Sequence, residues 1–132
     1  MNLLSFDLGA SSGKVFLGRF DGKALQLKLV KRFENSPIMV RNSLLWDVLR
    51  IYSELITAIV DGLKITNQIK SIGIDSFSND FGLLDRQGNF INQVYAYRDQ
   101  RTKRNEQKIY QIMSKERIHK LSGNQIAPFT TL

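Results

Sequence analysis

The chain has 132 residues, of which 42% are hydrophobic and 23% are charged, as expected for a globular domain with a single core. No apolar stretch approaches the roughly 18 residues of a membrane span, and the lack of cysteine excludes disulfides and thiolate metal sites. The net charge of +7 raises the question of nucleic-acid binding. The first residues include no basic residue, and Asp7 interrupts their apolar run, which argues against a secretory signal and favours the cytoplasm.

Three strands are predicted in the first part of the chain, at residues 3–8, 13–20 and 25–34. Asp21-Gly22, between the second and the third, is a strong hairpin signal, and Asn35-Ser36-Pro37 ends the third. Because the connections are short, we expect the three strands to form an antiparallel meander.

The turn between the first two strands, Asp7–Lys14, combines glycines and serines with one acid and one base. Such a turn lets the backbone approach a phosphate and forms a concavity for an anion, beside which Asp7 can hold a metal ion. The alternative is an ordinary β-hairpin turn, for which small polar residues are equally typical. A P-loop is excluded, because only three residues separate Gly9 from Gly13 and Val15 follows the lysine.

A polar connection leads to a predicted helix whose apolar residues recur at the spacing of one face. These residues are Trp46, Leu49, Tyr52, Leu55, Ile56, Ile59, Val60 and Leu63. Asp47 falls in or just before the first turn, where an acid favours the helix dipole. We expect Trp46 to belong to the core.

A short apolar strand, residues 69–75, follows the helix and ends in Asp75. A strand after a long helix returns parallel to the first strand, and this arrangement brings Asp75 to the sheet end that carries Asp7. Ligands bind at this end in open α/β sheets. We also expect Asp75 to have a functional role because a charge that closes a buried strand is costly.

A second hairpin is predicted from residues 81–84 and 90–97 around a turn at Asp85, followed by helices at residues 102–113 and 115–121. The segment from Arg98 to Lys120 holds eight basic and three acidic residues, which is five of the seven net positive charges. Its apolar residues have helical spacing, so we interpret the charges, and His119 among them, as a solvated helix surface and expect no nucleic-acid partner.

Three strands, a helix and a parallel strand in this order are the layout of the ribonuclease-H-like α/β fold, which actin-like ATPases and sugar kinases use. There is no internal repeat, low-complexity tract or long linker. We therefore expect residues 1–132 to form one domain, an antiparallel three-strand meander plus a parallel strand with flanking helices.

Three segments together resemble the FGGY family of carbohydrate kinases. They are DLGASSGKV at Asp7–Val15, GIDSFSNDFGLLD at Gly73–Asp85 and YAYRDQRT at Tyr95–Thr102. Their order and spacing are similar to those of the branch of the family that phosphorylates rhamnulose. The resemblance runs over nearly the whole chain and implies an ATP-dependent, magnesium-dependent sugar kinase.

The resemblance also implies roles for single residues. The residues that would face the ATP phosphates and Mg²⁺ are Asp7, Ala10, Ser11, Ser12, Gly13 and Lys14, with Asp7 at the metal. The residues that would lie around the sugar are Asp75, Ser78, Asp80, Tyr97, Arg98 and Asp99, the last three lining or bracing the pocket. Carboxylates and an arginine suit a polyol, which needs fixed acceptors and donors.

Two departures from the family pattern shape the expected activity. Phe77-Ser78-Asn79 stands where the rhamnulose branch has Trp-Gly-Val, so we expect L-rhamnulose as the first substrate and another ketose or small polyol as the second. The family's catalytic aspartate and its second, adenosine-binding lobe have no counterpart before Leu132. We therefore expect the chain to be an incomplete N-terminal lobe that is inactive alone and that self-associates through the apolar surface left without its partner lobe.

Two other functions fit the same fold. A metal-dependent nuclease would use Asp7 and Asp75 with the basic helix, although it has no need of the glycine-serine loop. A non-catalytic module would have only the shape of a kinase lobe.

Overall fold

The computed structural model of the chain describes residues 1–125 and 127. They form two compact units. The first, which we call the sheet unit, comprises Met1–Ser36 and Asp47–Phe77. The second, which we call the helical unit, comprises Pro37–Trp46 and the described residues from Ser78 onward.

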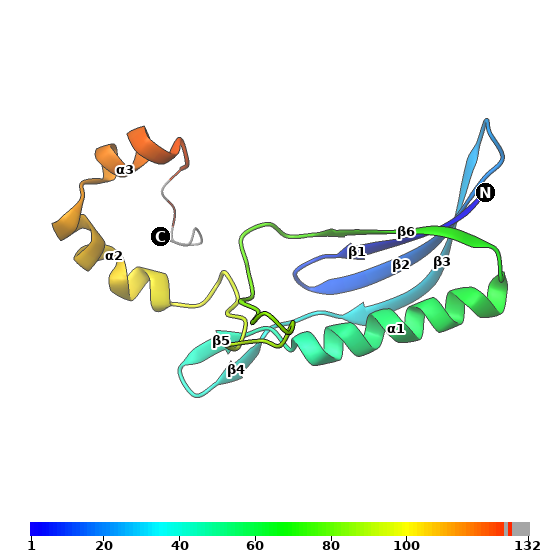
Figure 1. The fold of residues 1–132 in the computed structure, drawn as a ribbon, viewed down its shortest axis with the longest axis horizontal. Helices are drawn as coiled ribbons and strands as arrows, with labels where there is room; N and C mark the ends of the chain where they lie inside the picture. The colour runs from blue at the N-terminus through cyan, green and yellow to red at the C-terminus, as the bar shows by residue number, and fades with distance from the viewer. Residues whose placement is uncertain (126, 128–132) are drawn as a thin grey trace. The chain divides into compact units, whose positions relative to one another are not determined.

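A four-stranded sheet forms most of the sheet unit (Figure 1). Its strands are β1 (Asn2–Leu8), β2 (Ser12–Phe20), β3 (Leu25–Glu34) and β6 (Ile69–Ser76), in the order β3-β2-β1-β6. The first three are antiparallel neighbours, and β6 runs parallel to β1. The predicted meander and the parallel fourth strand are confirmed.

The hairpin between β2 and β3 forms at Asp21-Gly22, as predicted. The Asp21 carboxylate accepts hydrogen bonds from the backbone N–H groups of Lys23 and Ala24, both at 2.8 Å. Gly22 has a φ of 104°, a conformation that residues with a side chain rarely adopt. The turn is therefore specified by both Asp21 and Gly22.

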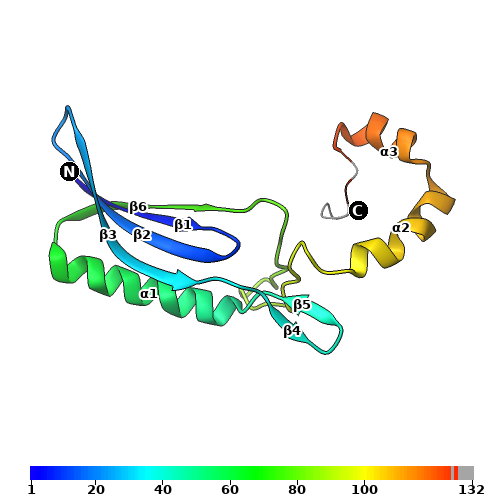
Figure 2. The same ribbon diagram turned by 180° about the vertical axis from the view of Figure 1, so that it is seen from behind.

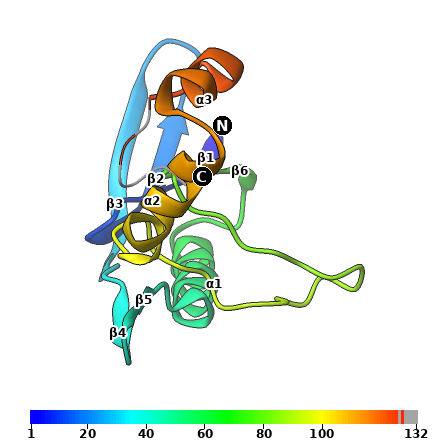
Figure 3. The same cartoon turned by 90° about the vertical axis from the view of Figure 1, so that its left-hand side faces the viewer.

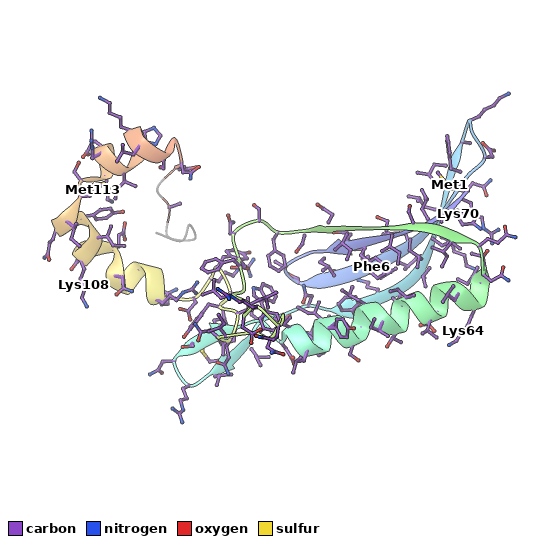
Figure 4. The ribbon with its side chains drawn as sticks, in the orientation of Figure 1. Met1, Phe6, Lys64, Lys70, Lys108 and Met113 are labelled. Carbon is purple, nitrogen blue, oxygen red and sulfur yellow. The ribbon has the colours of Figure 1, made fainter. Side chains whose placement is uncertain are left out.

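The core of the sheet unit lies between the sheet and α1 (Val48–Ile65), which packs against β3 and β1 (Figure 2). Alternate residues of each strand point to this side because side chains of a strand alternate between faces. The buried residues are Leu4, Phe6, Val15, Leu17, Phe33 and Ala58. Figure 4 shows Phe6 between the sheet and α1.

Helix α1 starts at an N-cap, as the position of Asp47 predicts. The Asp47 side chain accepts a hydrogen bond from the backbone N–H of Arg50 at 3.0 Å, which satisfies one of the free donors of the first turn. Trp46 lies just before this cap. It is buried, as expected, but its predicted place on the helix face is wrong, because the helix begins after it.

Only part of the predicted apolar face of α1 packs against the sheet. Leu55 and Ile59 contact the core beside Ala58 and Gly62. The other predicted residues are 44% to 78% exposed and form a second, solvent-facing row that we call the outer stripe: Leu49, Tyr52, Ile56, Val60 and Leu63. The helix is apolar on two sides, so for these residues the predicted burial is wrong.

The helical unit begins with a hairpin of β4 (Ile38–Val40) and β5 (Ser43–Leu45), in a segment predicted to be only a connection. Of the hairpin predicted at residues 81–97, the part next to the turn forms, with an antiparallel bridge between Leu84 and Phe90 and with Ile91 N donating to Leu83 O at 2.9 Å, whereas its predicted continuation to Tyr97 is wrong. The segment around Tyr95 pairs with β5 instead, with Ala96 N donating to Leu44 O and Trp46 N to Val94 O. A non-local partner thus replaces the local one.

The turn at Asp85 forms as predicted, with a structural role. Its carboxylate accepts hydrogen bonds from the backbone N–H groups of Gln87 and Asn89 and from the Asn89 amide. These bonds lower the pKa of Asp85.

Helices α2 (Arg101–Ile112) and α3 (Lys115–Ser122) follow, close to the predicted ranges (Figure 3). Ser114 caps the start of α3, and Gly123, with a φ of 70°, ends it. The lysines of both helices and His119 are exposed, which confirms the predicted solvated surface for these residues. None of the described helices has the length and apolar character needed to cross a bilayer.

Candidate functional site

The loop between β1 and β2 is held from the end of β3. The backbone N–H of Asn35 donates to Ser11 O at 3.1 Å, and the Asn35 side chain donates through Nδ2 to Gly9 O at 2.8 Å. Within the loop, Gly9 N donates to Ser12 O at 3.2 Å. Ser11 is exposed, whereas Asn35 is fully buried. The loop is therefore an ordered turn whose outer side faces solvent.

Asn35 is the residue of this site that the sequence analysis missed. It was assigned only to the turn that ends the third strand. No local signal marks it, because only the pairing of β2 with β3, with Ser12 opposite Glu34, brings the residue that follows β3 beside Ser11.

Gly13 is required for packing. It lies opposite Phe33 on β3, and a Cβ on Gly13 would lie 2.2 Å from Cζ of the Phe33 ring. At Gly9 a Cβ would lie 3.1 Å from Ser12 O. Neither glycine has a positive φ. The structure thus gives Gly13 a role in the core beside its predicted role at a phosphate.

Asp7 and Asp75 are neighbours on adjacent parallel strands. They are paired in the register between β1 and β6, so both lie at the same end of the sheet and on the same face. The predicted juxtaposition is confirmed. This face is opposite to the one that carries Leu4 and Phe6, so the carboxylates are outside the core.

Lys14 pairs with Asp7 across the hairpin. The two residues are opposite each other in the register between β1 and β2, and Lys14 Nζ lies 3.3 Å from Asp7 Oδ2. Both side chains are partly exposed, at 38% and 48%. The Lys14 ammonium is thus available to bind an anion, and the Asp7 carboxylate beside it is available to bind a cation.

Asp75 differs from its prediction in one respect. It is exposed, and so are its neighbours Ile72 and Ile74, at 47% and 61%. The argument that Asp75 closes a buried strand is therefore wrong, because β6 is the edge of the sheet. Asp75 is a candidate site residue because it is paired with Asp7 on the neighbouring strand.

Asp7 fits Mg²⁺ only together with phosphate ligands. No group of three or more acidic, histidine or cysteine side chains that could hold a metal occurs among the described residues. Mg²⁺ is commonly bound by one or two carboxylates, with phosphate oxygens and water completing its six ligands. Asp7 supplies one such carboxylate, and Asp75 is paired with it on the neighbouring strand.

The remaining predicted residues belong to the helical unit. The Asp80 carboxylate accepts a hydrogen bond through Oδ2 from Trp46 Nε1 at 2.7 Å. Arg98 is exposed and donates through Nε to Tyr97 Oη at 2.9 Å. Ser78 is exposed.

Asp99 is a brace. Its side chain is 2% exposed, and its two oxygens accept hydrogen bonds from the backbone N–H groups of Leu44, at 2.7 Å, and Arg101, at 2.8 Å. The Arg101 guanidinium is also 3.8 Å away. Of the two predicted roles, lining and bracing, this geometry favours bracing.

Asp80 should make the stability of the protein depend on pH. Burial raises the pKa of Asp80, although the hydrogen bond from Trp46 and the charge of Arg101 act in the opposite direction. A carboxyl whose pKa is higher in the folded state stabilises the fold below its unfolded pKa, and this contribution is lost as the pH rises through the folded pKa. We expect Asp80→Asn, which keeps an acceptor for Trp46, to raise the melting temperature at neutral pH and to have no effect in acid.

Thermal unfolding of the wild type and the variant from acidic to neutral pH measures this difference. Asp85→Asn is the control, and its effect on the melting temperature should have the opposite sign. Because the pKa of Asp85 is lowered in the folded state, removal of this carboxylate should destabilise the fold only above the unfolded pKa. If Asp80→Asn is destabilising at neutral pH, the inferred cost of the buried charge is wrong.

Comparison with known families decides the assignment. The model of the "FGGY family of carbohydrate kinases, N-terminal domain" matches residues 2–132. The chain belongs to the FGGY family.

Relatives within the FGGY family cover nearly the whole chain. A protein named rhamnulokinase from Oceanobacillus iheyensis is 37% identical over 98% of the chain. One of the same name from Bacteroides thetaiotaomicron is 36% identical over 99%. The chain spans 27% of the length of each.

Solved structures of FGGY kinases have the same fold. Gluconate kinase from Lactobacillus acidophilus matches 97% of the chain with a TM-score of 0.77 at 18% identity. Plasmodium falciparum glycerol kinase, solved with ADP, matches 98% with a TM-score of 0.71 at 21% identity. The chain spans 26% and 27% of these proteins. The predicted ribonuclease-H-like fold is confirmed.

Proposed function

We propose that this chain is the N-terminal part of a kinase that transfers the γ-phosphoryl group of ATP to a hydroxyl of a ketose, with L-rhamnulose as the first choice. The observation that carries the proposal is the identity of 36% to 37% with proteins named rhamnulokinase over nearly the whole chain. The pairing of Asp7 with Asp75 beside a glycine-serine loop supports it.

In the proposed reaction, the loop binds the phosphates of ATP. The N–H groups of Ala10, Ser11 and Ser12 and the hydroxyls of the two serines donate to phosphate oxygens, and Lys14 adds a positive charge. Asp7 holds Mg²⁺, which neutralises phosphate charge when it is bound. Phosphoryl transfer needs mainly positioning and charge stabilisation, and these residues supply both.

The sugar is bound by side chains that offer acceptors and donors to hydroxyls. We assign this role to Asp75, Ser78, Asp80, Tyr97 and Arg98. Asp99 supports the segment that carries Tyr97 and Arg98 by holding the backbone at Leu44 and Arg101. Ser78, in a segment that departs from the rhamnulose branch, is the position where a different sugar would be selected.

The rest of the kinase supplies what this chain lacks. The relatives are almost four times as long, and we place the catalytic aspartate and the adenosine site in their additional part. The chain alone is therefore inactive, and the full kinase acts in the cytoplasm. A ribonuclease-H-like nuclease is disfavoured, because no cluster of three acidic side chains is present among residues 1–125 and 127.

A coupled assay of ADP release tests the proposal. The full-length kinase that contains this chain is incubated with ATP, Mg²⁺ and a panel of ketoses and polyols. We expect the highest kcat/KM with L-rhamnulose. If none of the sugars stimulates ADP release, the proposed function is wrong; if another ketose does so best, only the choice of substrate is wrong.

The exposed apolar residues of the sheet unit fit the missing part of the kinase. The outer stripe of α1 is apolar over four turns, and Ile72 and Ile74 of β6 lie on the same face of the sheet as Leu4 and Phe6 yet are exposed. Exposed apolar patches of this kind mark interaction surfaces. We propose that the remainder of the kinase covers them.

The isolated chain should therefore self-associate. In sedimentation velocity at increasing concentration, we expect the 132-residue chain to form larger species and the variant Tyr52→Glu/Val60→Glu to remain closer to a monomer. Leu121→Glu, at a residue of α3 that is also 62% exposed, is the control and should behave as the wild type. Equal association of all three would contradict a role of the outer stripe.

A further inference from the structure

A buried asparagine holds the loop between β1 and β2 in place. Asn35 and Asp99 are the buried polar residues among those described, and Asn35 has no exposed surface. It binds two carbonyl groups of the loop at once, Ser11 O through its backbone N–H and Gly9 O through Nδ2. One residue thus fixes two alternate peptide groups of a segment that lies more than twenty positions earlier in the chain.

The side chain of Asn35 places one unsatisfied polar atom in the interior of the sheet unit. Its Oδ1 is buried and has no hydrogen-bond partner among the described residues. A buried acceptor without a partner is destabilising, and an apolar side chain of similar size would avoid it. An apolar side chain would not supply the Nδ2 donor to Gly9 O. We therefore infer that the Asn35 amide stabilises the loop between β1 and β2 and does not stabilise the core.

Holding the carbonyls determines where the neighbouring N–H groups point. The described chain contains no cis peptide bonds, and in a trans peptide the C=O and the N–H point in opposite directions. Because the carbonyls of Gly9 and Ser11 are turned toward Asn35, the N–H groups of the same two peptide units, those of Ala10 and Ser12, point away from it. These are donors of the loop assigned above to phosphate.

We propose that Asn35 is a positioning residue for nucleotide binding, which aims the N–H groups of Ala10 and Ser12 at a phosphate of ATP. The inference rests on the proposed function of the loop. Asn35 does not touch the nucleotide and acts only through the two carbonyls that it holds. Without its side chain, Gly9 O loses its donor and the peptide unit that carries the Ala10 N–H can rotate, whereas the backbone N–H of residue 35 still holds Ser11 O.

Kinetics of the full-length kinase with Asn35→Leu test this role. Leucine has a similar volume and removes both the Nδ2 donor and the unpaired Oδ1. We expect a melting temperature close to that of the wild type, a KM for ATP raised by about 10-fold, and an unchanged KM for the sugar. Asn35→Ala, measured beside it, should raise the KM for ATP similarly and lower the melting temperature because it leaves a cavity.

Asn2→Ala is the matched control. Asn2 also donates through Nδ2, to Thr66 Oγ1 at 3.1 Å, and lies at the other end of β1 in the same unit. It should affect stability without changing the KM for ATP. If the Asn35 variants lower only the melting temperature, or raise the KM values for ATP and sugar equally, the positioning role is overturned.

A measurement that does not depend on activity separates this inference from the proposed function. The Gly9 N–H is hydrogen-bonded to Ser12 O inside the loop, so its hydrogen exchange reports on the order of the loop. We expect faster exchange in Asn35→Leu and no change in Asn2→Ala. Unchanged exchange in Asn35→Leu overturns the positioning role, whereas intact use of ATP by an Asp7→Asn variant would overturn the assignment of the site itself.

Discussion

Replacement of Asp7 by asparagine in the full-length kinase is expected to lower kcat by about 10²-fold. Asp7 lies beside Asp75 at the end of the sheet, and its carboxylate is 3.3 Å from the Lys14 ammonium. Asparagine keeps the size of the side chain but removes the negative charge that would bind Mg²⁺ beside the phosphates. The fold should be unaffected, because the Asp7 side chain is half exposed and outside the core.

The control for Asp7 is another acid that is paired with a lysine. Asp61 Oδ1 lies 2.8 Å from Lys64 Nζ on the surface of α1, in the same unit. Asp61→Asn removes the same charge and should leave kcat within about twofold of the wild type, as surface ion pairs contribute little. Steady-state kinetics of ADP release and the melting temperatures of both variants decide the matter. A kcat for Asp7→Asn equal to that for Asp61→Asn would contradict the metal-binding role.

Substitution of Gly13 by alanine is expected to reduce the free energy of unfolding by about 3 kcal/mol, the upper part of the range for overpacked cores. The new Cβ would lie 2.2 Å from the Phe33 ring, closer than two carbon atoms can approach. Phe33 is 7% exposed and β2 lies between two strands, so neither the ring nor the backbone can move without disturbing the core. Urea denaturation followed by circular dichroism measures the loss.

Gly73→Ala is the matched control for Gly13→Ala. Gly73 lies in β6 of the same sheet, and a Cβ there would meet nothing within 4 Å. It should be neutral or slightly stabilising, because alanine restricts the unfolded chain. The double variant Gly13→Ala/Phe33→Leu should recover part of the loss by replacing the ring with a smaller side chain. Equal stability of the two alanine variants would show that the Phe33 ring can be displaced without cost.

The parts of the fold that could be predicted from the sequence depend on local signals. Alternating residues and Asp21-Gly22 specify the meander, and Asp47 marks the start of α1. The meeting of Asp7 and Asp75 is non-local, yet it follows from a general rule, because a strand after a helix returns parallel to its neighbour. The rule needs no knowledge of individual contacts.

The parts that could not be predicted depend on partners that are distant in the sequence. Residues 94–96 pair with the segment around β5 rather than with the nearer residues 81–84, and alternation alone cannot distinguish the two partners. The periodicity of α1 likewise identifies apolar residues on two sides without telling which side the sheet covers. Asn35 was missed for a related reason, since its contacts with Gly9 and Ser11 exist only after β3 has folded back.

The buried Asp99 carboxylate connects two distant segments of the helical unit. The Asp99 carboxylate accepts hydrogen bonds from the backbone N–H groups of Leu44 and Arg101, and the bond to Leu44 closes a loop between residues 55 positions apart. Closing so long a loop restricts the chain whatever ligand is present. The Asp99 carboxylate therefore orders the segment that carries Tyr97 and Arg98 independently of any bound ligand.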